Sequence, residues 1–348
     1  PGSKPLLFAL IQLLEGDVLL PAPSWVSYAP HAHLANRRVA LVETDPRDHH
    51  RLTTGALADA LTRAQHAGAD PRILVVNTPS NPTGGMFARE DIEAIASWAR
   101  EHGITIISDE IYAELAHGWR EHLSPARYYP EGCIVTGGLS KAFSAGGWRL
   151  GYAALPPGDA GQRLMSSLQA LASEIWSAAS TPVMQAAVTA YSANPDLETY
   201  VQSCARLHSY TTSRLYEVLV DLGVDCPRPA GGFYLYPDFA PWQASLRQRG
   251  ITTSNQLARH LLDEWNIATL PGTAFGDKPE ALRLRLATSM LYAQAPALSA
   301  EDQEQALWHM IEQAGTWTNE DGMDQRVRLE LPMLERARKR LGEFVESL

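Results

Sequence analysis

Residues 137–152 read GGLSKAFSAGGWRLGY, and they follow a β-type run from Gly132 to Thr136. Five glycines surround Lys141 and Arg149, which stand eight positions apart. Glycine lets a backbone adopt unusual φ and ψ angles and approach a ligand closely. A lysine in such a turn is held near its neighbours, and the planar guanidinium of arginine suits a phosphate or a carboxylate. This stretch therefore predicts a ligand-binding turn at the end of a strand.

Three other interpretations of the stretch are open at this point. A nucleophile elbow requires a glycine where Ala142 stands. A phosphate-binding P-loop requires serine or threonine after the lysine, and Ala142 occupies that position too. A surface loop with an ordinary lysine is the commonest setting for a single lysine. The rest of the chain decides among these interpretations.

Composition and charge exclude several classes of protein. The chain has 348 residues, of which 45% are hydrophobic and 20% charged, as in a globular protein with one large or two ordinary domains. Its net charge of −10 argues against binding to nucleic acid or to an anionic membrane. No apolar run approaches the roughly 20 residues that span a bilayer. Three scattered cysteines and the lack of a signal-peptide pattern predict a cytoplasmic protein without disulfides.

Polar residues follow three apolar runs that are typical of buried parallel strands. The run 72–77 leads into a turn that contains Asn81, the run 104–108 ends at Asp109, and the run 132–136 precedes Lys141. Ligands of open α/β sheets bind at the carboxyl ends of the strands. Since helical patterns alternate with these runs, we expect a mostly parallel sheet with helices on both faces.

The first residues predict a second ligand-binding feature. Ser3 is suited to cap a helix that carries Leu6, Leu7, Leu10, Ile11 and Leu14 on one side. The amides of Gly2 and Ser3 would then lie at a positive helix terminus, which attracts anions. A plain capped helix is the alternative. The pairs His31/His33 and His49/His50 lack a third ligand nearby, so no metal site is expected.

Several of these motifs together resemble one family. The chain contains Gly138-Leu139-Ser140-Lys141, Gly147-Trp148-Arg149-Leu150-Gly151-Tyr152, Asn81-Pro82-Thr83-Gly84 and Asp109-x-x-Tyr112. They resemble the lysine segment and cofactor motifs of the fold-type I, pyridoxal-phosphate-dependent aminotransferases of class I/II, the aspartate-aminotransferase-like family. One departure is that Gly138 stands where the family has a serine that binds phosphate.

The resemblance implies a role for each matching residue. Lys141 would form a Schiff base with pyridoxal 5′-phosphate and act as the general base and acid. Asp109 would pair with the pyridinium nitrogen, and Asn81 and Tyr112 would contact the 3′-oxygen, with Asn81 also near the substrate. Trp25 would stack on the pyridine ring. The remaining cofactor ligands would be Gly2, Ser3, Lys4, Ser140 and Arg149.

The strand 282–289 alternates leucine with arginine. In the family, an arginine in a strand of the form Arg-x-x-x-Ala binds the substrate α-carboxylate. The position of Ala287 selects Arg283 for this role. Arg285 is then expected to face solvent on an edge strand.

The resemblance also implies the domain organisation. We expect a large cofactor-binding domain at 1–193 whose N-terminal portion is absent, because no family arm precedes Pro1. Residues 194–348 would form an interdomain helix and a smaller α+β domain, with an unusual insert near 291–330 whose role the sequence does not indicate. A homodimer with the site at its interface is implied.

The expected function is transfer of an amino group between an L-amino acid and a 2-keto acid. The same residues would serve another pyridoxal-phosphate enzyme, such as a C–S lyase, synthase, decarboxylase or oxidase. A cofactor-sensing regulatory domain is a third hypothesis, which the acidic charge and the presence of Lys141 and Asp109 disfavour.

Overall fold

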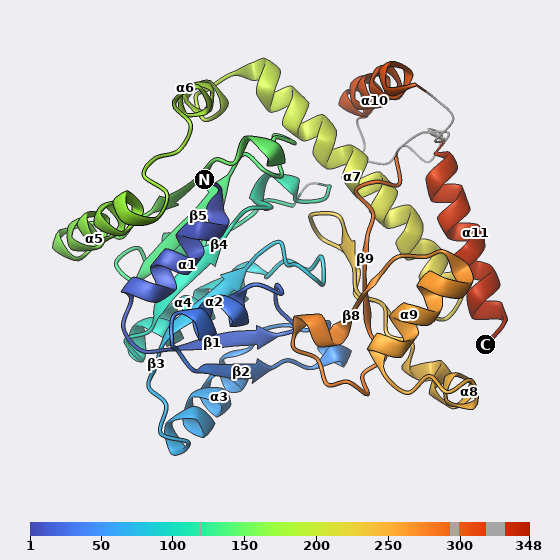
Figure 1. Cartoon of the computed structure of the whole chain (residues 1–348), viewed down its shortest axis with the longest axis horizontal. Helices are drawn as coiled ribbons and strands as arrows, with labels where there is room; N and C mark the ends of the chain where they lie inside the picture. The colour runs from blue at the N-terminus through green and yellow to red at the C-terminus, as the bar shows by residue number, and fades with distance from the viewer. Residues whose placement is uncertain (119, 293–298, 318–330) are drawn as a thin grey trace. The chain divides into compact units, whose positions relative to one another are not determined.

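The structure is a computed structural model, and it describes residues 1–118, 120–292, 299–317 and 331–348 (Figure 1). Much of the insert predicted near 291–330 lies outside these residues. The part of the insert that is described contains α10 (Ala300–Gly315).

The chain divides into two compact units. The first comprises residues 1–79, 87–113 and 122–198, and the second comprises 80–86, 114–121 and 199–348. The change of unit near the middle of the chain falls inside α7 (Pro195–Asp221), five residues after the predicted boundary. The short segments 80–86 and 114–121 also belong to the second unit, which no pattern in the sequence indicated.

A six-stranded sheet forms the centre of the first unit. Its order is β2-β1-β3-β4-β5-β6, and all neighbouring pairs are parallel except β5 and β6. The strands are β1 (Asp17–Ala22), β2 (Val39–Glu43), β3 (Pro71–Asn77), β4 (Thr105–Asp109), β5 (Cys133–Gly138) and β6 (Gly151–Ala154). The predicted mostly parallel sheet is confirmed.

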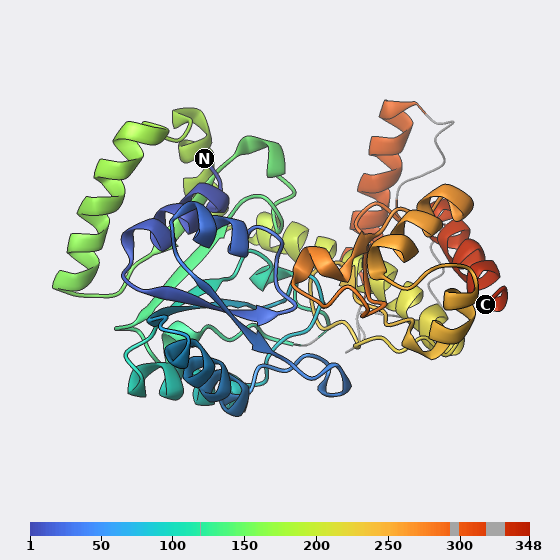
Figure 2. The same ribbon diagram turned by 60° about the horizontal axis from the view of Figure 1, so that its bottom comes forward.

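Helices cover both faces of this sheet, because the apolar strands present side chains in both directions. Ile73 and Val75 of β3 pack into one core with α1 (Ser3–Leu13), α2 (Tyr28–Leu34) and α5 (Asp159–Ile175). The alternate residues Leu74 and Val76 pack into another core with α3 (Thr54–His66) and α4 (Arg89–Glu101). Figure 2 shows α1 and α2 on one side of the sheet and α3 and α4 on the other.

The second unit has a smaller sheet than the first unit. Its antiparallel sheet has the order β7 (Tyr234–Leu235), β9 (Leu284–Ala287), β8 (Leu270–Pro271). The helices α8 (Gln243–Gln248), α9 (Ser254–Trp265), α10 and α11 (Pro332–Glu346) share one core with most of α7. This agrees with the predicted α+β character of the C-terminal part.

The remaining elements are α6 (Thr181–Ala190) and a set of short 3-10 turns. These are η1 (Pro46–Asp48), η2 (Ala113–Leu115), η3 (Pro125–Arg127), η4 (Gly146–Trp148), η5 (Ala240–Trp242) and η6 (Gly272–Phe275). None of the helices in the described ranges combines the length and apolar character that crossing a membrane requires.

Candidate active site

The carboxyl ends of β3, β4 and β5 place polar residues side by side at one edge of the large sheet. The parallel register pairs Asn77 with Asp109 and Asp109 with Thr136. The amide nitrogen of Asn77 donates a 2.8 Å hydrogen bond to the backbone carbonyl of Asp109. Asp109 is therefore held by both neighbouring strands, at the edge where open α/β sheets bind ligands.

The carboxylate of Asp109 is buried in a polar niche. The Tyr28 hydroxyl donates a 2.7 Å hydrogen bond to Oδ2, and the Thr136 hydroxyl lies 3.5 Å from Oδ1. Burial raises the pKa of Asp109 to about 6, while the hydrogen bond from Tyr28 acts in the opposite direction. A buried acid with a pKa this close to neutrality is typical of functional sites.

Tyr28 is a site residue that sequence reasoning missed. It begins α2, and its phenol crosses from that helix to the end of β4. The only signal in the sequence is its position three residues after Trp25. The ring of Tyr28 packs edge-on against the ring of Trp25, with 5.2 Å between centroids.

Lys141 lies in the first unit, three residues beyond the end of β5. Its Nζ lies 5.9 Å from the centroid of the buried Tyr112 ring. Tyr112 comes three residues after Asp109 in the turn that follows β4. The predicted residues Asp109, Tyr112 and Lys141 therefore belong to one compact unit and surround one edge of its sheet.

The N-terminus of α1 and the glycine-rich turn form a cradle for an anion. The helix begins at Ser3, with Gly2 in the capping position, so Ser3 is not the cap that the sequence predicted. A Cβ atom on Gly2 would overlap the Arg149 guanidinium, and one on Gly151 would overlap the amide nitrogen of Ser3. Arg149 also lies 3.3 Å from the Ser140 hydroxyl. Helix amides, a hydroxyl and a guanidinium therefore converge, which suits a phosphate.

Trp25 and Lys4 lie next to each other near this cradle. The Nζ of the exposed Lys4 is 4.9 Å from the centroid of the Trp25 ring. His31 packs edge-on against the same ring, and burial together with the charge of Lys4 lowers the pKa of His31 to about 4. His31 is therefore neutral near pH 7 and packs against the rings of Phe8 and Trp25. Direct contacts from Lys4 and Trp25 to a cofactor stay predictions.

The second unit holds a different polar arrangement around Asn81 and Arg285. The Arg285 Nη1 donates a 3.1 Å hydrogen bond to Oδ1 of the buried Asn81. The guanidinium carbon lies 4.7 Å from the centroid of the Tyr234 ring and 5.1 Å from that of Phe275. We call Asn81, Tyr234, Phe275 and Arg285 the arginine station. Aromatic faces that stack on a guanidinium restrict its orientation.

Arg283 occupies a different environment from the one predicted. Its guanidinium forms ion pairs of 2.8 Å with Asp238 and 3.0 Å with Asp277, and the Tyr236 hydroxyl donates to the same oxygen of Asp277. Two carboxylates from its own unit therefore neutralise Arg283, which leaves its predicted role as a substrate ligand without support.

The expectation for Arg285 is wrong. β9 is the central strand of its sheet rather than an edge strand, and Arg285 is half-buried against aromatic rings. Strand alternation places Arg283 and Arg285 on the same face. The sequence pattern therefore does not show which of the two meets carboxylates from distant parts of the chain.

The residues of the first unit fit pyridoxal phosphate. The cradle at Gly2, Ser3 and Arg149 offers donors to an anionic phosphate, and a Cβ atom on Gly151 would overlap the backbone of Gly2 and Ser3. The buried carboxylate of Asp109 suits the protonated nitrogen of a pyridine ring. Gly138 fits its position for a separate reason, because a Cβ atom there would lie 2.6 Å from the Leu150 carbonyl oxygen.

Comparison with known proteins identifies the family. Residues 1–294 match the family described as "Aminotransferase class I and II". The chain is 33% identical to an aspartate aminotransferase of Geobacillus stearothermophilus over 296 residues, which is 83% of this chain and 71% of that protein. It is also 33% identical to an aspartate/prephenate aminotransferase of Thermus thermophilus, over 83% of this chain and 70% of that protein.

A solved structure agrees with these sequence relationships. A mutant of the Thermus thermophilus aspartate aminotransferase superposes with a TM-score of 0.72 at 30% identity, covering 89% of this chain and 78% of that chain. The fold, the family match and the relatives agree with one another. The chain belongs to the class I and II aminotransferases and is a pyridoxal-phosphate-dependent aminotransferase of fold type I.

Proposed function

We propose that the enzyme moves an amino group between an L-α-amino acid and a 2-keto acid with Lys141 as the proton carrier. The observation that carries the assignment of the site is the buried Asp109, held by Tyr28 in the same unit as Lys141 and the anion cradle. Aspartate is the first donor to test, because several relatives are named as aspartate aminotransferases.

Each residue of the first unit has a distinct task in this proposal. Pyridoxal phosphate, when bound, supplies an aldehyde carbon that reacts with amines and a ring that withdraws electrons from the amino-acid Cα. The cradle of Gly2, Ser3 and Arg149 binds the phosphate, and Asp109 holds a proton on the ring nitrogen. The amine of Lys141 would move the proton between the amino-acid Cα and the C4′ atom of the cofactor. Tyr112, whose ring centroid lies 5.9 Å from the Lys141 Nζ, would contact the 3′-oxygen of the cofactor.

For the substrate carboxylate, we propose Arg285 together with Asn81. Arg285 is oriented by two aromatic rings and by the Asn81 side chain, whereas Arg283 is neutralised by Asp238 and Asp277. Arg285→Gln should raise the amino-acid KM about 100-fold, because a bidentate charged contact is lost. If Arg283→Gln raises KM and Arg285→Gln does not, Arg283 binds the substrate carboxylate, as its position relative to Ala287 predicted.

We also propose that the enzyme is a homodimer. Helices α5 and α6, at the periphery of the first unit in Figures 1 and 2, expose a set of large apolar side chains. These are Met165, Ile175, Met184, Val188 and Tyr191, with Ile175 and Val188 about 60% exposed. Exposed apolar patches commonly mark protein interfaces. Val188→Glu should give a monomer in sedimentation, whereas Leu262→Glu on α9 should leave the oligomer intact.

The cytoplasm is the proposed location. Cys133, Cys204 and Cys226 are buried free thiols, and burial raises the pKa of Cys133 and Cys226. Free thiols are typical of reducing compartments. Localisation of the tagged full-length protein in fractionated cells tests this assignment.

One spectroscopic experiment tests the proposed reaction. The absorbance of the protein with pyridoxal phosphate is recorded before and after adding amino acids singly, without any keto acid. Loss of the long-wavelength band, followed by its return when a 2-keto acid is added, supports amino transfer and identifies the donor. A keto-acid-independent release of product would instead favour a lyase or decarboxylase reaction.

The lysine assignment has its own control. Lys141→Ala should abolish turnover, because no other side chain is expected to carry the proton between Cα and C4′. Lys339→Ala changes an exposed lysine of α11 whose partner is Glu343, and it should leave turnover unchanged. Normal turnover in Lys141→Ala would disprove the assigned role.

A further inference from the structure

A glycine turn at residues 229–232 joins three segments of the second unit. The amides of Ala230 and Gly231 donate hydrogen bonds of 2.8 and 3.1 Å to the Gly84 carbonyl. The Gly232 amide donates a 2.8 Å bond to the Leu115 carbonyl, and the His117 amide donates a 2.8 Å bond to the Ala230 carbonyl. This turn therefore connects residues 80–86 and 114–118 to the strand that follows it.

The joined segments carry parts of the arginine station. Asn81 lies in the segment 80–86, and Tyr234 begins β7 directly after the turn. The fit between them is close, since a Cβ atom on Gly84 would overlap the Tyr234 carbonyl oxygen. Arg285 meets both Asn81 and the Tyr234 ring. The turn thus sets the spacing between two groups that hold Arg285.

The side chain of His117 adds a bond of a different kind to this assembly. It is 3% exposed, and its Nε2 lies 2.8 Å from the Gly232 carbonyl oxygen. A carbonyl oxygen only accepts hydrogen bonds, so Nε2 carries the proton and donates. Burial lowers the pKa of His117 to about 4, so the ring is neutral near pH 7. His117 follows the 3-10 turn η2 and lies outside the helices and strands, and this bond adds a side-chain contact to the backbone bonds that tie its segment to the turn.

We propose that His117 is a positioning residue for substrate binding: its Nε2–H···O=C bond to Gly232 holds the glycine turn, and through the turn Asn81 and Tyr234, in the geometry that orients Arg285. The inference rests on the proposed carboxylate role of Arg285 and Asn81. It predicts an effect mainly on amino-acid binding, because the phosphate cradle and Asp109 belong to the first unit. Of the residues that this turn positions, Asn81 is the one that the family resemblance also places at the cofactor.

Two substitutions at position 117 test the bond. His117→Met keeps a similar volume but removes the donor, and it should raise the amino-acid KM about tenfold, since a buried hydrogen bond to a carbonyl is lost. His117→Gln keeps a donor near the position of Nε2 and should stay within about twofold of the unsubstituted enzyme. In both variants kcat should be unchanged, and the affinity for pyridoxal phosphate in an absorbance titration should change less than the amino-acid KM, since only Asn81 among the positioned residues is expected at the cofactor.

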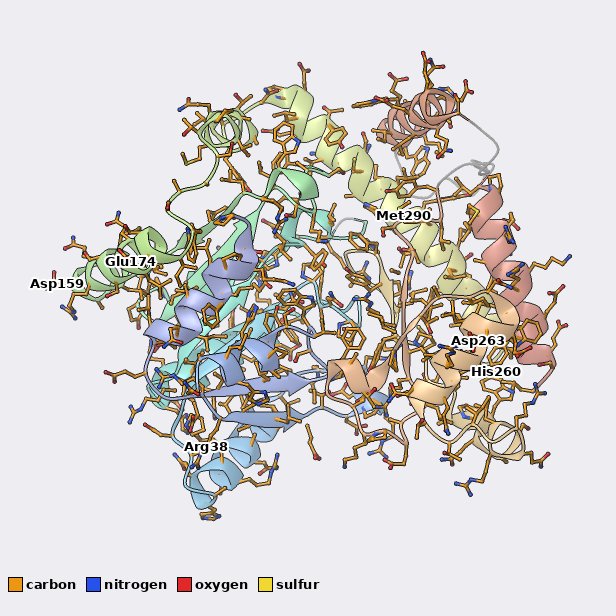
Figure 3. All side chains as sticks on the ribbon, in the orientation of Figure 1. Arg38, Asp159, Glu174, His260, Asp263 and Met290 are labelled. Atoms are coloured by element: carbon orange, nitrogen blue, oxygen red, sulfur yellow. The ribbon has the colours of Figure 1, made fainter. Side chains whose placement is uncertain are left out.

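A control histidine separates this effect from general disturbance of the unit. His260 on α9, labelled in Figure 3, packs against the Phe344 ring with 6.1 Å between centroids. It belongs to the same unit, but α9 contains no residue of the arginine station. His260→Met should leave the amino-acid KM unchanged even where it lowers the melting temperature.

The outcomes distinguish the positioning role from the proposed function. If Arg285→Gln leaves KM unchanged in an active enzyme, Arg285 does not bind the substrate carboxylate, and the positioning role of His117 is then wrong as well. If Arg285→Gln raises KM and a folded His117→Met variant does not, the positioning role alone is overturned. Should His117→Met not fold, His117→Asn replaces it: its amide is too short to reach Gly232, so an unchanged KM there overturns the proposal.

Discussion

The phenol of Tyr28 donates a 2.7 Å hydrogen bond to Asp109 across 81 positions of sequence, and both side chains are buried. A carboxylate that must pair with a ring nitrogen has to be ionised, yet burial favours its neutral form. The bond from Tyr28 stabilises the ionised form without adding a charge. The hydrogen bond from Tyr28 therefore favours an ionised Asp109 in a site from which water is excluded.

Removing this hydrogen bond should shift the pH dependence of cofactor binding. Tyr28→Phe raises the pKa of Asp109 above its value of about 6, because the bond lowers that pKa. The affinity for pyridoxal phosphate, measured by absorbance titration between pH 5 and 9, should then begin to fall about one pH unit higher than in the unsubstituted protein. Tyr128→Phe, which removes an exposed hydroxyl near Arg89, is the control. Superimposable profiles for all three proteins would contradict the role of Tyr28.

Neutralising Asp109 should make the protein without cofactor more stable but inactive. The pKa rises from 3.8 to about 6 in the folded state, so the ionised group costs roughly 3 kcal/mol of stability above pH 6. That cost is absent below about pH 4 and grows between pH 4 and 6. Asp109→Asn removes it, so urea unfolding at pH 7 should show a gain of up to about 3 kcal/mol that disappears near pH 4. A loss of stability at pH 7 would show that the carboxylate is not strained by burial.

Arg283 should matter for stability rather than for catalysis. Arg283→Gln leaves Asp238 and Asp277 without their cation in a mostly buried site, which should cost about 2–4 kcal/mol in urea unfolding. The amino-acid KM should change by less than about threefold. Arg338→Gln breaks an exposed pair with Glu335 and should change stability by less than about 0.5 kcal/mol. A large increase in KM without destabilisation would show that Arg283 binds the substrate.

Restoring the family's serine at position 138 should weaken the cradle rather than strengthen it. A Cβ atom on Gly138 would lie 2.6 Å from the Leu150 carbonyl oxygen and 3.0 Å from Gly151 Cα, so β5 and β6 would have to separate. Gly138→Ser should cost about 1–3 kcal/mol in urea unfolding and lower the affinity for pyridoxal phosphate. Gly147→Ala is the control, because among the described residues no atom beyond its two chain neighbours lies within 4 Å of its Cβ position. Tighter cofactor binding in Gly138→Ser would contradict the packing argument.

Local chemistry explains why the sequence alone revealed so much of the first unit. Apolar runs that end in Asn77, Asp109 and Thr136 are local patterns, and parallel register then brings their ends together at one edge. Order along the chain and residue type therefore determined the α/β class, the family resemblance and the placing of Lys141 at that edge.

Tertiary structure decided the contacts that join distant segments. Alternation put Arg283 and Arg285 on one face, and only the folded positions of Asp238 and Asp277 distinguish them. The same holds for the bond from Tyr28 to Asp109 and for the turn that joins residues 80–86 to 114–118. Such contacts depend on which distant segments come together in the folded chain, and the periodicity of the sequence contains no information about that.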